Sequence, residues 1–322
     1  MPKALFFNKK PSEGVAPCAT RLKRRATSVV YVVCLLATPL LAQTTIGGGT
    51  CNSGSLNGIY SVSITGRQVT VAANAPGTYT NVLQANGAAT FDGLSTVTIS
   101  LTINTNQALA TATTWSGTYS VQANCAGVMN ITTGGSSTLN LALYDSGTDF
   151  LISGSDSSYT YSGSGIAQPA GCAVSTLSGV YSLTGTGFSL NATAVSGAES
   201  GTGLVQFDGL GHVTVNITMS TLGTPSSALT LTGSYTVSSS CLASASLTDT
   251  SANTYAMSFS IYNSTVNNAA FYATLAQSSN FLIAGSGRAL FGQPAAAAGL
   301  RRPAMDIPAK PWSSDAEGGI RA

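Results

Sequence analysis

Apolar and polar residues alternate with a period of two along much of the central part of the chain. In the segments STVTISLTI (95–103) and GHVTVNITM (211–219), every second residue is apolar, and Ser, Thr, Asn or His stands between. This period is that of a β-strand with one face buried. The apolar positions of these two segments are Val97, Ile99, Leu101 and Ile103, and Val213, Val215, Ile217 and Met219. A later segment alternates Met257, Phe259 and Ile261 with Ala256, Ser258 and Ser260.

The central part of the chain contains two copies of one sequence pattern. SLNGIYSVSITG (55–66) is echoed by TLSGVYSLTGTG (176–187), and FDGLSTVTISLTI (91–103) by FDGLGHVTVNITM (207–219). SGTYSVQANC (116–125) matches TGSYTVSSSC (232–241), and both copies end in Gly-Ser-Gly, at 163–165 and 285–287. Self-similarity of this kind indicates two structural units. We predict domains at 51–169 and 170–294, and the sequence does not show whether they pack together.

The number and spacing of the alternating segments predict the fold class. Each unit holds about eight or nine of them, separated by clusters of Gly, Asn, Ser and Asp. That spacing is typical of an antiparallel sandwich or barrel. Because the turns are short, consecutive strands should pair. We predict an all-β protein with two tandem up-and-down β-barrels of about eight strands each, with β-sandwiches as the alternative.

Both ends of the chain differ from the centre. Arg21, Lys23, Arg24 and Arg25 precede a short apolar run at 28–42, which is the pattern of a secretory signal. We predict a signal peptide at 1–42, a flexible leader at 43–50 and a disordered tail at 295–322. The protein is therefore expected to be secreted, either extracellular or in the periplasm or at the cell surface.

Four cysteines occupy matched places in the two units. Cys51 and Cys172 open the units, and Cys125 and Cys241 close the GTY and GSY segments. Four cysteines allow three pairings, but only Cys51 with Cys125 and Cys172 with Cys241 leaves each unit self-contained. We predict these two disulfides. Each closes a loop of about 70 residues, worth roughly 4 kcal/mol in the chain-entropy model.

The order of these motifs carries a resemblance. The chain resembles a repeated domain of uncharacterised secreted bacterial proteins in the order of its motifs. That order is a Gly-x-Tyr strand, a strand ending in Phe-Asp-Gly, a long alternating strand, and then Gly-Thr-Tyr or Gly-Ser-Tyr with a cysteine. More remotely, it is similar to lipocalin-like domains. The resemblance covers nearly all of 51–292. It implies an eight-stranded calycin-type barrel and supplies no catalytic residue, and no charged cluster is apparent inside the expected cavity.

Composition removes most enzyme classes. Charged residues are 7% of the chain and histidine occurs once, so few side chains are available to form a metal cluster or a His-based catalytic triad. Residues 43–294 hold two arginines and seven acidic residues, a net charge of −5 that argues against a nucleic-acid partner. We predict no metal, no cofactor and no catalytic activity.

The best candidates for chemistry have a structural interpretation. Asp92 and Asp208 could supply a carboxylate pair, but each precedes a glycine, Gly93 or Gly209, between two alternating segments. We interpret these four residues as hairpin turns, with aspartate expected to tolerate a positive φ. His212 is expected to be solvated, and its counterpart is Thr96. A recurring set of tyrosines is expected in the core rather than in a sugar-stacking platform: Tyr60, Tyr119, Tyr181 and Tyr235.

Three function classes stay open. The leading one is a secreted or cell-surface non-catalytic protein with a structural or adhesive role, whose partner is a cell-surface component. The second is lipocalin-like binding of a small apolar ligand in a barrel cavity, which a cavity in the structure would favour. The third is an outer-membrane barrel made by both units, since lipid-facing strands share the same period.

Overall fold

The computed structural model describes residues 50–72, 75–192, 194–226, 228–263, 269–277 and 280–290. The expected signal peptide and tail lie outside the described residues, as does the expected leader apart from residue 50. Among the described residues, no helix is long and apolar enough to cross a membrane.

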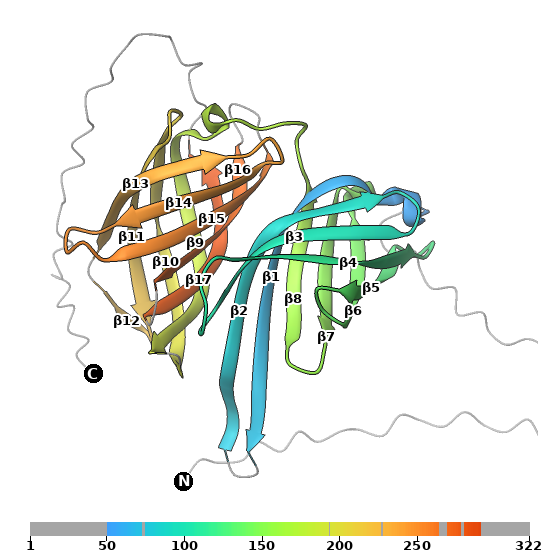
Figure 1. Cartoon of the computed structure of the whole chain (residues 1–322), viewed down its shortest axis with the longest axis horizontal. Coiled ribbons are helices and arrows are strands. Elements are labelled where there is room, and N and C mark those ends of the chain that lie inside the picture. The colour runs from blue at the N-terminus through green and yellow to red at the C-terminus, as the bar shows by residue number, and fades with distance from the viewer. Residues whose placement is uncertain are drawn as a thin grey trace, which may run out of the picture. The chain divides into compact units, whose positions relative to one another are not determined.

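The first unit, barrel 1, is a closed antiparallel barrel of eight strands in sequence order (Figure 1). β1 pairs with β8 to close it, and β1 and β2 continue past the neighbouring strands as a long hairpin. Two short 3-10 turns, η1 (Ser53–Ser55) and η2 (Asp145–Gly147), accompany it. The strands are β1 (Asn57–Ala72), β2 (Ala75–Asp92), β3 (Thr96–Thr105), β4 (Thr111–Val121), β5 (Ala126–Thr133), β6 (Ser137–Tyr144), β7 (Asp149–Ser155) and β8 (Thr160–Ala167).

The second unit, barrel 2, follows the 3-10 turn η3 (Val174–Thr176). Its first strand pairs with its last, β9 with β17, and the β10–β11 pairing completes the closed barrel. A short extra strand, β12 (Thr224–Pro225), pairs only with β11. The other strands are β9 (Ser178–Asn191), β10 (Ala194–Asp208), β11 (His212–Thr221), β13 (Leu229–Val237), β14 (Leu242–Thr248), β15 (Thr254–Asn263), β16 (Ala270–Gln277) and β17 (Phe281–Ala289). The prediction of two tandem antiparallel barrels is confirmed, and the sandwich alternative is wrong.

An aromatic cluster fills one end of each barrel. Its rings pack mostly edge to face with centroids 4.9 to 5.9 Å apart, a geometry that aromatic rings favour. The cluster is Tyr60, Phe91, Tyr119 and Phe150 in barrel 1, and Tyr181, Phe207, Tyr235, Phe259 and Phe271 in barrel 2. The recurring tyrosines are thus core residues.

The Gly-Ser-Gly motif that ends each copy makes room for this cluster. Gly165 pairs with Phe150, and Gly287 pairs with Phe271. A Cβ at either glycine would lie 2.2 Å from the Cζ atom of the ring opposite, so a side chain there would collide with the ring. The motif is therefore explained by packing.

A disulfide ties the start of each unit to its own barrel. Cys51 is bonded to Cys125 and Cys172 to Cys241, with Cα atoms 5.0 Å apart in both pairs. This is the pairing expected from the position of the cysteines in the two copies. Two disulfides are typical of a protein from an oxidising compartment.

The outer faces of the two barrels are partly buried against each other. Ser258 and Ser260 on β15 were expected to alternate toward solvent, yet both are buried. The Ser258 hydroxyl donates to Asn86 Oδ1 at 2.7 Å, and Asn104 Nδ2 donates to Thr274 Oγ1 at 3.0 Å. These hydrogen bonds replace water at the polar face of the strands. An apolar cluster lies beside them: Val82, Phe188, Leu190, Ala276 and Leu282.

Candidate functional site

The Phe-Asp-Gly turn of barrel 1 is built on a carboxylate that accepts backbone hydrogen bonds. Asp92 Oδ1 accepts the N–H groups of Leu94, Ser95 and Thr96 at 2.8, 2.8 and 2.9 Å. The positive φ of +76° belongs to Gly93 and not to Asp92. The expectation that the aspartate itself takes a positive φ is therefore wrong, because its side chain anchors the turn instead.

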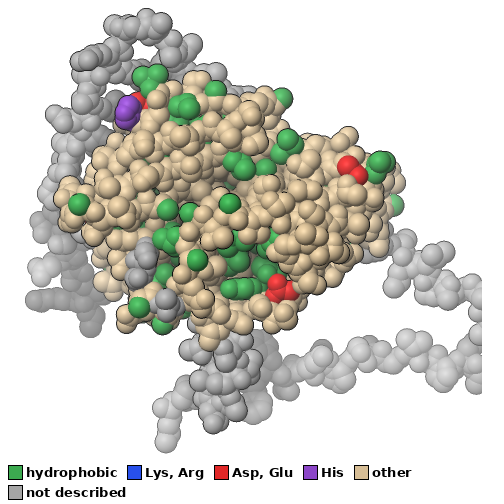
Figure 2. Space-filling view, in the orientation of Figure 1, with side chains coloured by type: hydrophobic (Ala, Val, Ile, Leu, Met, Phe, Trp, Pro, Cys, Tyr) green, Lys and Arg blue, Asp and Glu red, His purple; other side chains and the backbone are tan. Residues whose placement is uncertain are grey.

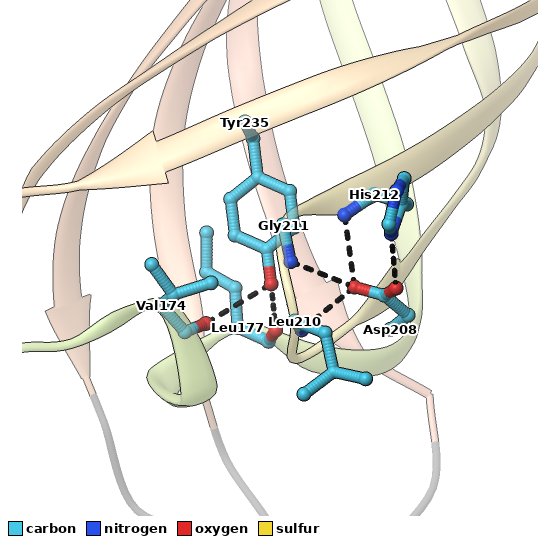
Figure 3. A network of polar contacts seen from close by, with 7 residues as sticks. All are labelled: Val174, Leu177, Asp208, Leu210, Gly211, His212 and Tyr235. Atoms are coloured by element: carbon cyan, nitrogen blue, oxygen red, sulfur yellow. Dashed lines mark hydrogen bonds and ion pairs between the residues drawn. The ribbon is translucent and has the colours of Figure 1, made fainter.

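Barrel 2 repeats this turn with a histidine in it (Figure 3). Asp208 Oδ1 accepts the N–H groups of Leu210, Gly211 and His212 at 2.7 to 2.9 Å, and Gly209 has a φ of +76°. His212 Nδ1 lies 2.7 Å from Asp208 Oδ2.

The histidine does what a threonine does in the first turn. The Thr96 hydroxyl donates to Asp92 Oδ2 at 2.6 Å, the same position that His212 Nδ1 takes beside Asp208. The His212 side chain is 80% exposed. The lone histidine therefore belongs to the turn.

The electrostatics of the two turn aspartates suit anchors rather than general acids. Hydrogen bonds from the hydroxyl and the N–H of Thr96 hold the pKa of Asp92 well below its usual range. Burial acts in the opposite direction on Asp208, but hydrogen bonds from His212 and Leu210 outweigh it and lower that pKa as well. Each carboxylate stays ionised and bound within its own turn.

Two of the core tyrosines close their barrels from the same end. The Tyr119 hydroxyl donates to the carbonyls of Ser53 and Leu56, both at 2.9 Å. The Tyr235 hydroxyl donates to the carbonyls of Val174 and Leu177 at 3.0 and 2.7 Å (Figure 3). Each barrel end therefore carries its 3-10 turn as a cover.

The opposite end of barrel 2 holds a cavity of about 320 Å³. Glu199 on its wall stands eight residues before Phe207 on β10, which places it roughly 26 Å from the aromatic cluster along the strand. Three lining residues, Ser226, Ala228 and Asn280, are exposed, so the cavity opens at this rim. The lining, which we call the Glu199 cavity, is Ser189, Glu199, Met219, Thr221, Ser226, Ala228, Leu229, Tyr255, Gln277, Asn280 and Phe281.

Glu199 is the buried charged group of this cavity. Its side chain comes from β10, and the residue is 7% exposed. Oε1 accepts a hydrogen bond from the Thr221 hydroxyl at 3.2 Å, and Oε2 has no hydrogen-bond partner among the described residues. Burial raises the pKa of this carboxyl, and the Thr221 hydrogen bond opposes that effect only in part.

The aromatic wall of the cavity is Tyr255 and Phe281, whose ring centroids lie 6.0 Å apart. The Tyr255 hydroxyl donates to Asp249 Oδ2 at 2.9 Å. Burial, together with this hydrogen bond, raises the pKa of Tyr255 to about 12, so the phenol stays neutral. Tyr255 thus lines the cavity with its ring, and its hydroxyl is held by Asp249.

Glu199 was missed from the sequence, although a signal for it exists. Counting back by twos from Phe207 gives Val205, Gly203, Gly201 and Glu199, so the register of β10 places Glu199 on the lumen side. The same count from Phe91 leads to Leu83 in barrel 1. No charged cluster was expected inside the cavity, and its lining carries one charged side chain, Glu199.

No protein-family model and no curated protein sequence matches the chain. Within the described ranges, no group of three His, Cys, Asp or Glu side chains is placed to hold a metal ion. The functional argument rests on the Glu199 cavity.

Proposed function

We propose that barrel 2 is a small-molecule-binding barrel, with the Glu199 cavity as its site, and that barrel 1 supports it structurally. The observation that carries the proposal is Glu199, a buried side chain that lines a cavity of about 320 Å³ and whose Oε2 has no hydrogen-bond partner among the described residues. Ligand sites are cavities of this size, mostly apolar, with a few placed polar groups.

The energetics favour an occupied cavity. A buried acceptor without a hydrogen bond costs about 1 to 3 kcal/mol, more when it is charged. A ligand donor at Glu199 Oε2 would recover that cost, and Met219, Leu229 and Phe281 would bury an apolar portion of the ligand.

The setting of the proposal is a secreted, lipocalin-like protein. Closed antiparallel barrels of eight strands are the architecture of lipocalins, and the two disulfides fit an oxidising compartment. In this proposal the protein is non-catalytic and carries its ligand outside the cytoplasm.

A structural or adhesive role is a second proposal, supported by barrel 1. Its lumen carries a continuous core from Phe91 to Trp115 and Tyr161, and its exposed positions are largely Ser, Thr and Asn. The outer-membrane alternative has less support, because the apolar side chains of both barrels face the lumen, whereas barrels in lipid present them outward.

The experiment is a screen of small neutral, cationic and anionic fragments by ligand-observed NMR on the full chain. Met219→Trp should fill the Glu199 cavity and abolish fragment binding. Ile103, the residue in barrel 1 that corresponds to Met219, gives the matched control Ile103→Trp, which should leave binding intact. A screen without binders, or binding that survives Met219→Trp in folded protein, would refute the proposed function.

A further inference from the structure

We propose that the Glu199 cavity selects a small organic cation, an ammonium group carried on a compact apolar body, with Glu199 as its counter-ion. This inference rests on the proposed function of barrel 2 and names the chemical class of its ligand.

The first argument is the hydrogen-bonding state of the carboxylate. Glu199 Oε1 is shared with the Thr221 hydroxyl, and Oε2 is buried with no donor among the described residues. A carboxylate accepts only, so the group that completes it must donate. An ammonium donates and also brings the compensating charge that a buried carboxylate requires.

The second argument is the charge around the cavity. Glu199 is the charged residue of the lining. Asp249 does not line the cavity, but it accepts the hydroxyl of Tyr255, which does. The cations of the described residues are Arg67 and Arg288, and neither lines the cavity. Arg67 lies over the Phe188 ring, 5.4 Å from its centroid. An anionic ligand would meet the Glu199 carboxylate and no cation among the lining residues that the structure describes.

The surface agrees with this distribution. Figure 2 shows a face of mostly neutral side chains with acidic groups at isolated places, and no described Lys or Arg is coloured on it. Among the described residues, no cation lines the cavity to compensate the Glu199 carboxylate.

The third argument is the lining. Tyr255 and Phe281 both line the cavity, and aromatic faces attract organic cations. Met219 and Leu229 provide apolar contact for the body of the ligand. The site thus combines a carboxylate oxygen that has no donor among the described residues, two aromatic rings and two apolar side chains.

The test is isothermal titration calorimetry of the full chain at neutral pH with three probes of equal chain length: octylammonium, 1-octanol and octanoate. We expect octylammonium to bind at least tenfold more tightly than 1-octanol, and octanoate to bind most weakly. Glu199→Gln should remove the preference for octylammonium and leave 1-octanol affinity within about twofold. Glu199→Asp, which keeps the charge, should keep the preference at lower affinity.

Asp156→Asn is the matched control, because it removes one carboxylate from barrel 1 without touching the cavity. It should change no affinity. Tightest binding of octanoate, or a preference for octylammonium unchanged in Glu199→Gln, overturns the inference. Equal binding of octylammonium and 1-octanol, both lost in Met219→Trp, overturns the cation and leaves the proposed function standing. If no probe binds and the fragment screen is also empty, both proposals fail.

Discussion

Barrel 1 and barrel 2 share one end and differ at the other. Both have the aromatic cluster, the disulfide and the Phe-Asp-Gly turn. At the opposite end of barrel 1, Trp115 and Tyr161 are each 5% exposed, and their rings pack edge to face at 5.9 Å. The Tyr161 hydroxyl donates to Asp156 Oδ2 at 2.6 Å. That end of barrel 1 is built as a core.

Barrel 2 carries smaller side chains at the same positions. Leu231 stands four residues before Tyr235, as Trp115 stands four before Tyr119, and Ile283 stands four before Gly287, as Tyr161 stands four before Gly165. These two exchanges remove aromatic volume, and Glu199 replaces Leu83 on the wall. The two barrels thus differ at this end in three matched side chains, of which Glu199 lines the cavity.

The largest expected effect concerns what the barrels share. Replacing both cysteines of one disulfide by serine, Cys51 with Cys125 or Cys172 with Cys241, should cost about 4 kcal/mol in either barrel. The closed loops are alike, since the sequence separations are 74 and 69 residues. Chemical denaturation followed by circular dichroism measures the loss. A large loss in one barrel and none in the other would contradict a shared scaffold.

The glycines beneath the aromatic cluster come next. Gly165→Ala and Gly287→Ala should each cost about 1 to 3 kcal/mol, because the new Cβ must push aside Phe150 or Phe271. Gly135→Ala in barrel 1 is the control, since a Cβ there meets its nearest atom at 3.7 Å. Thermal melting of the three variants ranks them, and an equal effect of all three would show that packing against the rings is unimportant.

At the end where the barrels differ, Glu199→Leu makes barrel 2 resemble barrel 1. We expect it to stabilise the protein by about 1 to 2 kcal/mol, because it removes Oε2, a buried acceptor with no partner in the described part of the chain. It should also abolish cation binding. The reverse exchange, Leu83→Glu, should destabilise barrel 1, because it buries a charge in a filled core. Loss of stability in Glu199→Leu would mean that the Thr221 hydrogen bond to Oε1 outweighs the cost of the unpaired Oε2.

The pH dependence of stability should distinguish Glu199 from the turn aspartates. Because burial raises the folded-state pKa of Glu199, its contribution is full below the unfolded pKa of about 4.3 and is lost as pH rises through the folded value. Asp92 and Asp208 have lowered pKa values, so their contribution is present above the unfolded pKa and is lost as pH falls.

Melting curves at pH 4 to 8 for wild type and Glu199→Gln measure the first of these contributions. The advantage of Glu199→Gln over wild type should grow as pH rises, and Tyr255 stays neutral throughout this range. A constant difference between the two proteins would show that Glu199 titrates as an ordinary surface carboxyl.

The smallest effects are expected at the turns. Asp92→Asn and Asp208→Asn keep an Oδ1 acceptor for three N–H groups. They lose the charge and the Oδ2 acceptor that faces Thr96 or His212, so each should lower the melting temperature slightly. Alanine at either position removes the acceptor and should lower it more. If polysaccharide hydrolysis were detected and Asp→Asn abolished it without changing the melting temperature, the non-catalytic proposal would be wrong.

Much of the fold could be predicted because it depends on short-range signals. The period of two along Val97–Ile103 and its echo along Val213–Met219 specify strands with one buried face, and short turns pair consecutive strands. The cysteine positions in the two copies indicate the disulfides. The Phe-Asp-Gly turns lie in the expected segments, but the aspartates act by accepting backbone hydrogen bonds and not by adopting a positive φ. The alternation of apolar and polar residues does not reveal such hydrogen bonds.

Closed barrels, the burial of Ser258 and Ser260, and the Glu199 cavity were decided only by the tertiary structure. Alternation marks two faces of a strand but does not say what covers the outer one. Barrel 1 covers Ser258 and Ser260 through contacts far apart in sequence. A cavity depends on the summed volume of side chains from many strands. The sequence by itself determined the strands, their order and the disulfide partners, because these follow from local period and matched position, whereas the hollow end of barrel 2 arises from packing between strands distant along the chain.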